Sequence, residues 1–253
     1  MWHTNCIFRD IGKEKNMIDG IKIMANAGMK QIYRLDRATH NIANVNTPGF
    51  KAERFRFLKP STKEVADIGN PSQGTVTSVD YSPGIMEKTG NILDLAINGK
   101  GFFSVQTNDG VGYTKDGRFK INANRELVTP TGEYVLGRRG KITIDGNDIM
   151  ISQDGKISLS GNEVDELKIV SFSEPSALVK NDKGLYRDPD NLAGEKKDED
   201  SKIQSGYLEL SNVQAVMEMV EMINIQRTFE SYQKVILTIS EQNKMSTNRI
   251  GKL

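Results

Sequence analysis

Both ends of this chain carry apolar residues at heptad spacing, and this feature constrains the fold more than any other. The first stripe consists of Ile18, Ile21, Ala25, Gly28, Ile32, Leu35 and, after a gap at Thr39, Ile42. The last stripe consists of Met222, Ile225, Phe229, Tyr232, Ile236 and Ile239, followed by Asn243, Ser246, Ile250 and Leu253. Alternating steps of three and four residues keep one face of a helix apolar, as in the seam of a coiled coil. We therefore expect two long terminal helices that pair with each other and with other chains.

The ends of these helices are predicted from local signals. Residues 17–46 are predicted as one helix that stops at Thr47-Pro48-Gly49, because proline cannot continue the hydrogen-bond ladder. The chain is predicted to be helical from Tyr207 to the C-terminus, with the main helix over 211–253. In that helix a second set of apolar residues precedes the heptad stripe, and we interpret it as a wider apolar face that meets more than one partner helix. This set consists of Val213, Val216, Val220 and Ile223.

The region between the helices is predicted to be β-structure. From Ile85 to about Asp188 the chain alternates short apolar runs with turn signals, which favour an antiparallel meander or a small barrel. The turn signals are Asn108-Asp109-Gly110, Asp116-Gly117, Asn122-Ala123-Asn124, Thr131-Gly132, Asp145-Gly146 and Asp154-Gly155. A short extended piece is expected over 50–57, and a strand over 74–81. The fold class is therefore α+β: long N- and C-terminal helices forming a coiled-coil-like pair, with a central, mainly antiparallel β domain.

These patterns divide the chain into segments. Residues 1–16 are interpreted as an N-terminal extension, because the heptad pattern begins directly after Met17. The other segments are 17–58 (N-terminal helix and turn), 59–84 (linker-like), 85–205 (β-rich domain) and 206–253 (C-terminal helix). Within the third of these, residues 188–202 are predicted to be a charged loop.

Composition excludes several classes of protein. The chain is 37% hydrophobic and 26% charged, which is ordinary for a folded protein, and its apolar runs are too short to span a membrane. Its formal charge of +1 gives no global attraction to nucleic acid. Residues 1–16 lack the apolar core of a signal peptide. The single cysteine cannot form a disulfide within the chain.

No catalytic or metal-binding constellation emerges from the sequence. Two carboxylate pairs, Asp109/Asp116 and Asp145/Asp154, suggest the acid and base of a glycosidase, but each residue opens an Asp-Gly turn, which explains it. His40 has no second histidine or cysteine beside it, so we expect no metal site there. The Gly99-Lys100-Gly101 segment lacks the third glycine of a phosphate-binding loop. We expect no enzyme activity and no cofactor.

Three stretches together resemble the flagellar axial proteins, the bacterial rod and hook family. They are LDRATHNIANVNTPGFKAERFRF (35–57), LDLAINGKGFFSVQTNDGVGYTKDGRFKINANRELVTPTGEYVLG (93–137) and LELSNVQAVMEMVEMINIQRTFESYQKVI (208–236). All three occur in the order typical of that family and cover most of 17–253. The short segment 59–99 and the ending of the chain favour the proximal type of rod subunit. The alternatives are the distal rod type, another axial hook-basal body protein, and a periplasmic wall hydrolase.

The resemblance implies a structural role. Such subunits leave the cytoplasm through the flagellar export apparatus without a cleaved signal peptide, and they stack into the hollow shaft that crosses the periplasm and transmits torque from motor to hook. Their terminal helices form the inner tube and the β domain an outer layer. The implied partners are further copies of the chain, other rod and hook axial subunits and the export apparatus. Neither nucleic acid nor membrane insertion is implied.

Residues from both ends are expected to form the subunit-assembly surface. The set comprises Ile21, Leu35, Asn41, Ile42, Asn44, Asn46, Thr47, Pro48, Gly49, Phe50, Asn212, Val213, Met222, Arg227, Phe229, Glu230, Tyr232, Ile236 and Ile239. The three asparagines are interpreted either as ordinary polarity at a helix end or as amides that join neighbouring subunits or cap the helix. Arg227 and Glu230 are three residues apart, so an ion pair within the helix and a bridge between subunits both remain open.

Overall fold

A computed structural model of the chain describes residues 4–57, 75–146, 148–181 and 183–250, without the side chains of 4–21, 56–57, 75–76, 243 and 246–250. The chain separates into two compact units. We call Met1–Ile42, Glu53–Ser78 and Gln214–Leu253 the helical unit, and Ala43–Ala52 with Val79–Val213 the β unit. The α+β class predicted from the sequence is confirmed, since two long helices flank a central antiparallel β region.

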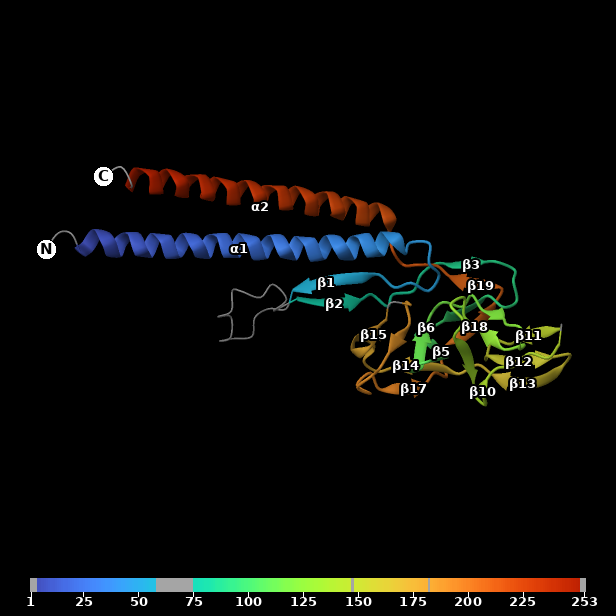
Figure 1. The fold of residues 1–253 in the computed structure, drawn as a ribbon. Coiled ribbons are helices and arrows are strands. Elements are labelled where there is room, and N and C mark those ends of the chain that lie inside the picture. The colour runs from blue at the N-terminus through green and yellow to red at the C-terminus, as the bar shows by residue number, and fades with distance from the viewer. Residues whose placement is uncertain (1–3, 58–74, 147, 182, 251–253) are drawn as a thin grey trace. The chain divides into compact units, whose positions relative to one another are not determined.

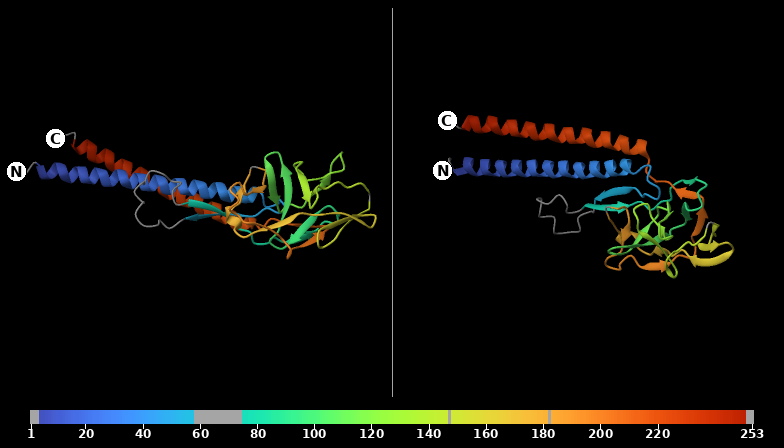
Figure 2. Two further views of the ribbon diagram at one scale, coloured as in Figure 1. Left: turned by 90° about the horizontal axis from the view of Figure 1, so that it is seen from below. Right: turned by 45° about the vertical axis from the view of Figure 1, so that its right-hand side comes forward.

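Two long helices dominate the helical unit. Helix α1 spans Thr4–Ala43 and helix α2 spans Ala215–Ile250. They run antiparallel and lie side by side in every view (Figures 1 and 2). Strands β1 (Glu53–Phe57) and β2 (Thr75–Val79) lie in the two segments expected to be extended, and they pair as a small two-stranded sheet, which was not predicted.

The predicted helix boundaries needed correction. Helix α1 continues without interruption across the predicted boundary between residues 16 and 17, and it ends at Ala43 rather than at residue 46. The earlier end arises because the Thr47 amide donates to the Asn44 carbonyl at 3.1 Å and closes a turn before Pro48. Helix α2 starts at Ala215 rather than at 207 or 211. The preceding residues 207–209 form strand β19, which pairs with β3 (Met86–Lys88).

The β unit is built from short antiparallel strands. Its strands after β3 are β4 (Leu95–Asn98), β5 (Phe102–Thr107), β6 (Gly110–Thr114), β7 (Lys120–Ile121), β8 (Leu127–Val128), β9 (Tyr134–Gly137), β10 (Gly140–Lys141), β11 (Ile149–Ile151), β12 (Lys156–Leu159), β13 (Asn162–Glu166), β14 (Ile169–Phe172), β15 (Val179–Lys180), β16 (Tyr186–Arg187), β17 (Glu195–Lys197), β18 (Lys202–Ser205) and β19 (Tyr207–Glu209). The largest sheet has the order β15-β16-β6-β5-β9-β8-β7, with β10, β14 and β17 attached beside this path. This order is not a simple meander.

Most of the predicted turns are hairpins. Asn108-Asp109-Gly110 joins β5 to β6, Thr131-Gly132 joins β8 to β9, and the turns at 122–124 and 154–155 also connect paired strands. Two of the predicted hairpins were wrong. Asp116-Gly117 does not join paired strands, since β7 pairs with β8 rather than with β6. Asp145-Gly146 does not either, since β11 pairs with β12 rather than with β10. Gly117 therefore serves close packing, since a Cβ there would lie 1.6 Å from the Leu95 carbonyl oxygen. The predicted loop 188–202 also contains a strand, β17, which pairs with β14.

Strand β5 organises the core of the β unit because both of its faces are buried. Phe103 packs in a large cluster that also contains Leu95, Val105 and Phe119, and its ring meets Phe119 edge to face at 5.0 Å. Phe102 points to the opposite face and packs in a second cluster with aromatic neighbours. Two buried faces on one strand give the β unit an apolar core of its own.

Candidate assembly site

The described part of the predicted stripe of α2 forms the more buried face of that helix, while the side chains of Asn243, Ser246, Ile250 and Leu253 lie outside the described set. Ile225 is 2% exposed, and Met222, Phe229, Tyr232, Ile236 and Ile239 are half-buried. The Phe229 ring approaches Gly28 of α1, where an added Cβ would lie 3.6 Å from it. We call these six α2 residues the inner stripe. A bulky ring against a glycine lets the two helices approach closely.

The predicted stripe of α1 matches its buried face in part. Gly28 is buried, and Leu35 and Ile42 are half-buried, whereas Ile32 and Ala25 are exposed. Three residues outside the predicted stripe complete the buried face: Gln31, Ala38 and Asn41, of which Asn41 was predicted as part of the assembly set. The side chain of Ile21 lies outside the described set. The sequence placed the seam correctly to within about one position around the helix.

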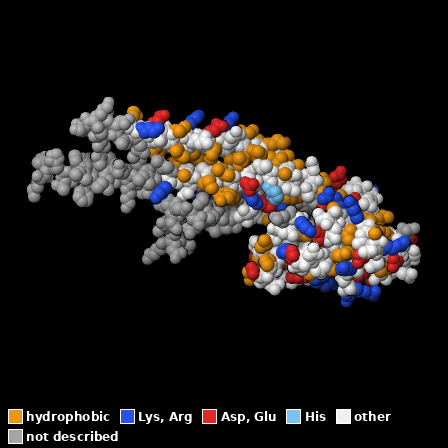
Figure 3. Space-filling view, viewed as in Figure 1, with side chains coloured by type: hydrophobic (Ala, Val, Ile, Leu, Met, Phe, Trp, Pro, Cys, Tyr) orange, Lys and Arg blue, Asp and Glu red, His pale blue; other side chains and the backbone are white. Residues whose placement is uncertain are grey.

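The second set of apolar residues predicted for the C-terminal helix divides in the structure: Val213 precedes α2 and is buried, whereas the other three lie on α2 and are exposed. Val216, Val220 and Ile223 are 73%, 48% and 51% exposed, and we call them the outer stripe. On α1, Met29, Ile32 and Tyr33 are also exposed. Figure 3 shows apolar side chains gathered over both helices. Large apolar side chains grouped on an exposed surface mark a site of contact with another protein.

Charged side chains join elements within the helical unit. Arg34 of α1 pairs with Glu221 of α2, and Arg37 Nη1 donates to Glu53 Oε2 of β1 at 2.7 Å. These groups line a recess of about 270 Å³ together with Phe55 and Met217. The sequence analysis did not identify these pairs, because partners so far apart in the sequence leave no periodic signal.

The asparagines at the end of α1 have different environments. Asn41 is buried, and its amide donates to the Glu53 carbonyl at 2.9 Å and accepts from the Glu53 backbone N–H at 2.9 Å. The Asn44 side-chain oxygen accepts from the Thr47 hydroxyl at 3.2 Å, whereas Asn46 is exposed. The Asn41 amide is thus engaged within the chain. It fixes β1 against the end of α1 through a paired backbone contact.

The turn that follows the asparagines belongs to the β unit. Pro48 and Phe50 are buried, and Gly49 has a φ of 69°, a conformation that favours glycine. A Cβ at Gly49 would lie 2.3 Å from the Lys115 carbonyl carbon, and the Gly49 amide donates to the Glu209 carbonyl at 2.7 Å. The Pro48-Gly49 signal therefore marks a turn whose backbone lies in close contact with Lys115 and Glu209, which are distant in the sequence.

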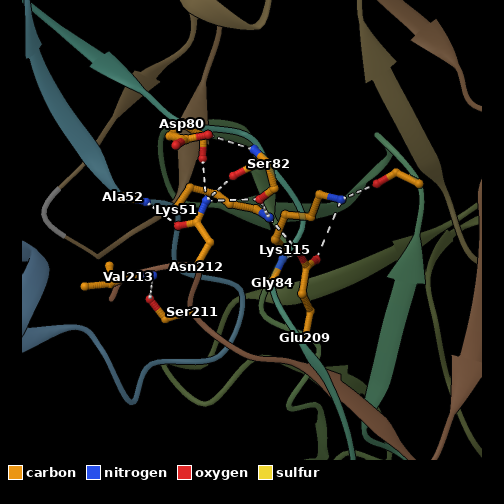
Figure 4. A network of polar contacts seen from close by, with 11 residues as sticks. Lys51, Ala52, Asp80, Ser82, Gly84, Lys115, Glu209, Ser211, Asn212 and Val213 are labelled. Carbon is orange, nitrogen blue, oxygen red and sulfur yellow. Dashed lines mark hydrogen bonds and ion pairs between the residues drawn. The ribbon is translucent and has the colours of Figure 1, made fainter. Parts of the chain in front are cut away.

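Lys51, Lys115 and Glu209 form a buried charge cluster in the β unit (Figure 4). The Lys51 ammonium donates to Glu209 Oε1 at 2.6 Å and to the Ser82 carbonyl at 2.8 Å. The Lys115 ammonium lies 3.9 Å from Glu209 Oε2 and donates to the Gly99 carbonyl at 2.8 Å. Lys51 is 1% exposed and Glu209 is 2% exposed. Charges buried this deeply are tolerated only when paired and hydrogen-bonded.

The two lysines of the cluster share the Glu209 carboxylate at different distances, 2.6 Å for Lys51 and 3.9 Å for Lys115. Burial lowers the pKa of Lys115 to about 8, and the neighbouring charge of Lys51 acts in the same direction, while Glu209 and Asp198 oppose it. This cluster was not predictable from the sequence, because lysine and glutamate are usually exposed and no motif marks the buried exceptions.

Asn212 and Val213 secure the end of the β unit. The Asn212 side-chain oxygen accepts from the Ala52 backbone N–H at 2.8 Å, and its amide nitrogen donates to the Asp80 carbonyl at 2.8 Å (Figure 4). Val213 is buried with Phe50 and Ala52. These bonds hold residues before α2 in an extended path, which explains why the helix begins later than predicted.

Arg227 and Glu230 do not form the ion pair that the sequence left open. Both are exposed, and neither has an ion pair among the described residues.

The carboxylates considered as possible glycosidase pairs each contact a separate cation: Asp109 contacts Arg187, Asp116 contacts Arg118, Asp145 contacts Arg125 and Asp154 contacts Lys202. His40 lies 3.4 Å from Glu53, and the described residues contain no cluster of metal ligands. No described helix has an apolar stretch long enough to cross a membrane.

Two family models match the chain. Residues 96–159 match the flagellar hook protein FlgE/F/G D1 domain, and residues 204–249 match the flagellar basal body rod FlgEFG protein C-terminal region. The flagellar basal-body rod protein FlgF of Caulobacter vibrioides is 37% identical over 227 residues, covering 87% of this chain and 92% of the relative. FlgG of Bacillus subtilis is 36% identical over 85% of this chain and 93% of the relative. FlgF of Salmonella typhimurium is 33% identical, over 79% and 86%.

Paired terminal helices with exposed apolar residues, together with a separate β unit, define a structural subunit built for assembly. The chain belongs to the flagellar basal-body rod protein family. Its role is structural rather than enzymatic, and membership implies assembly with other axial flagellar subunits.

Proposed function

We propose that this chain polymerises through its terminal helices into the hollow flagellar rod and transmits torque from motor to hook. The observation that carries this proposal is the outer stripe, Val216, Val220 and Ile223, which is exposed, whereas the neighbouring inner stripe is buried or half-buried. Burying one Val or Ile side chain contributes about 1.5–3 kcal/mol. Burial of the outer stripe against other subunits therefore supplies a driving force for assembly.

Head-to-tail contacts between copies generate an open filament, because different surfaces meet and the arrangement does not close. In this assembly we assign residues 17–58 and 206–253 to the inner tube, 85–205 to the outer layer and 59–84 to the connection between them. The residues of the predicted assembly set lie outside the outer stripe. Among them, the exposed Arg227 and Glu230 are placed to form charge contacts with neighbouring subunits.

We further propose that the chain is a proximal rod subunit of the FlgF type, with the distal FlgG type as the alternative. The short segment 59–99 and the ending of the chain support the proximal type. Its partners are then neighbouring axial subunits, and it reaches the periplasmic rod through the flagellar export apparatus without signal-peptide cleavage. Binding of the purified chain to separately purified axial subunits tests this assignment through the neighbour it selects.

The assembly proposal is tested by replacing Val220 and Ile223 together with serine. We expect an unchanged helical signal in dilute solution, but loss of filaments in electron micrographs and loss of motility in a complemented strain. Glu241→Ser changes an exposed residue of the same helix outside the outer stripe and serves as the control. Removing the residues after Gln242 is also expected to abolish assembly while the β unit stays folded. Normal rods from the double serine variant would contradict the proposal.

A further inference from the structure

A polar trough of about 710 Å³ lies in the β unit beside the β5–β6 hairpin, and the proposed rod function does not use it. Its lining side chains come from four separate segments of the chain. They include the side chains of Asn108, Glu133, Tyr134, Lys141, Lys183 and Arg187. A recess of this volume is large enough for a ligand of several linked rings.

Two ion pairs fix charged groups in the trough. Lys183 Nζ lies 2.8 Å from Glu133 Oε1, and Arg187 Nη1 lies 3.3 Å from Asp109 Oδ2. Glu133 is buried and also accepts hydrogen bonds from the Thr129 and Thr131 hydroxyls. Burial raises the pKa of Glu133, but these bonds and Lys183 outweigh it and lower the pKa to about 2. Both carboxylates are therefore already neutralised by cations of the chain.

Lys141 adds a further cation to the trough. Its ammonium lies 3.6 Å from the centre of the Tyr134 ring, in a cation–π contact. Within the described ranges no carboxylate pairs with it. The trough thus offers a positive charge to an incoming anionic group at a place where its other charges are balanced.

The rest of the lining selects the chemistry of the ligand. Among the described residues that line the trough, Tyr134 is the one aromatic side chain and none is aliphatic. Such a lining disfavours an apolar peptide side chain or a lipid. Amides, hydroxyls and ion pairs place donors beside acceptors, which matches adjacent hydroxyl groups on a sugar ring.

We propose that the trough binds an acidic carbohydrate, with Lys141 contacting a sugar carboxylate and the amides and ion pairs contacting sugar hydroxyls. No residue of the outer stripe lines this site.

The test uses calorimetric titration of the full chain with tetragalacturonate, a sugar chain with a carboxylate on each ring. We expect Lys141→Met to weaken binding about tenfold or more, the effect of one charge-assisted hydrogen bond. Asn108→Ala, which removes an exposed amide of the trough, is expected to weaken binding as well. Lys197→Met is the matched control, because Lys197 is an exposed lysine that does not line the trough.

Two further probes separate the possible ligands. The neutral chain chitotetraose is expected to bind at least about tenfold more weakly than tetragalacturonate, because it lacks the carboxylate that Lys141 contacts. A tetraglutamate peptide is expected not to compete. The proposal is overturned if tetragalacturonate gives no heat of binding, if Lys141→Met and Lys197→Met behave alike, or if the peptide competes as well as the sugar.

Discussion

The two units of this protein treat their apolar residues in different ways. In the β unit, strand β5 is buried on both faces, and the large cluster around Phe103 is enclosed by the chain itself. In the helical unit, Ala38 of α1 and Ile225 of α2 are the buried hydrophobic residues among the helix side chains that the structure describes, while many others are exposed. A unit that covers its own core is expected to be stable alone. A helix pair with an exposed apolar face gains further stability from neighbouring subunits.

The largest change in stability is expected from Glu209→Gln, which acts on the β unit alone. It leaves the buried Lys51 and Lys115 ammoniums without a carboxylate, and removal of one partner of a buried ion pair costs about 3–5 kcal/mol. We expect that loss in the free energy of unfolding from denaturant titration, followed by near-ultraviolet circular dichroism. Glu199→Gln, at an exposed carboxylate 3.8 Å from Lys197, is the control and is expected to change little. Equal stability of the two variants would contradict the importance of the cluster.

Two isoleucine substitutions on α2 compare a covered residue with an exposed residue of the helical unit. Ile225→Ala removes a buried side chain of the inner stripe and is expected to cost about 2–4 kcal/mol of helix-pair stability. Ile223→Ala, in the outer stripe, is expected to cost less than about 0.5 kcal/mol in dilute solution. Thermal unfolding followed by the helical circular dichroism signal measures both variants. If Ile223→Ala destabilised the dilute protein as much as Ile225→Ala, the outer stripe would already be covered within the chain.

The β unit is also expected to respond to alkaline pH. Burial lowers the pKa of Lys115 from 10.5 to about 8, so between these values the unfolded chain holds a proton that the folded chain has released. The free energy of unfolding then rises with pH, by at most about 1.4 kcal/mol per pH unit for one proton. Denaturant titrations from pH 7.5 to 10.5 measure this slope. Lys115→Met is expected to remove it, and an unchanged slope in that variant would assign the effect to another group.

The smallest expected effect concerns the contact between the helices. An added Cβ at Gly28 would lie 3.6 Å from the Phe229 ring, an ordinary van der Waals distance. Gly28→Ala is therefore expected to raise helix-pair stability by about 0.5–1 kcal/mol through helix propensity. The melting temperature of the helical signal measures this gain. Gly49→Ala is the contrasting variant and is expected to destabilise the β unit, because its φ is 69° and the added atom would collide with the Lys115 backbone.

Much of the fold was predictable because it follows from local periodicity. The inner stripe of α2 was predicted residue by residue, since a helix of this length repeats its buried position every seven residues. Hairpins such as 108–110 and 131–132 were predictable because their glycines adopt positive φ. Strand β19 and the start of α2 were not, because their conformation depends on pairing with β3 and on the hydrogen bonds of Asn212.

The sequence by itself determined the elements whose signals lie within a few residues: the two amphipathic helices, most hairpins and the family of the chain. The tertiary structure alone decided which strands are neighbours in the sheet, that Gln31 and Ala38 complete the buried face of α1, and that Lys51, Lys115 and Glu209 come together without solvent. The physical reason is the range of each interaction. Helix periodicity and turn geometry act between nearby residues, whereas burial of a charge depends on a partner brought from a distant part of the chain.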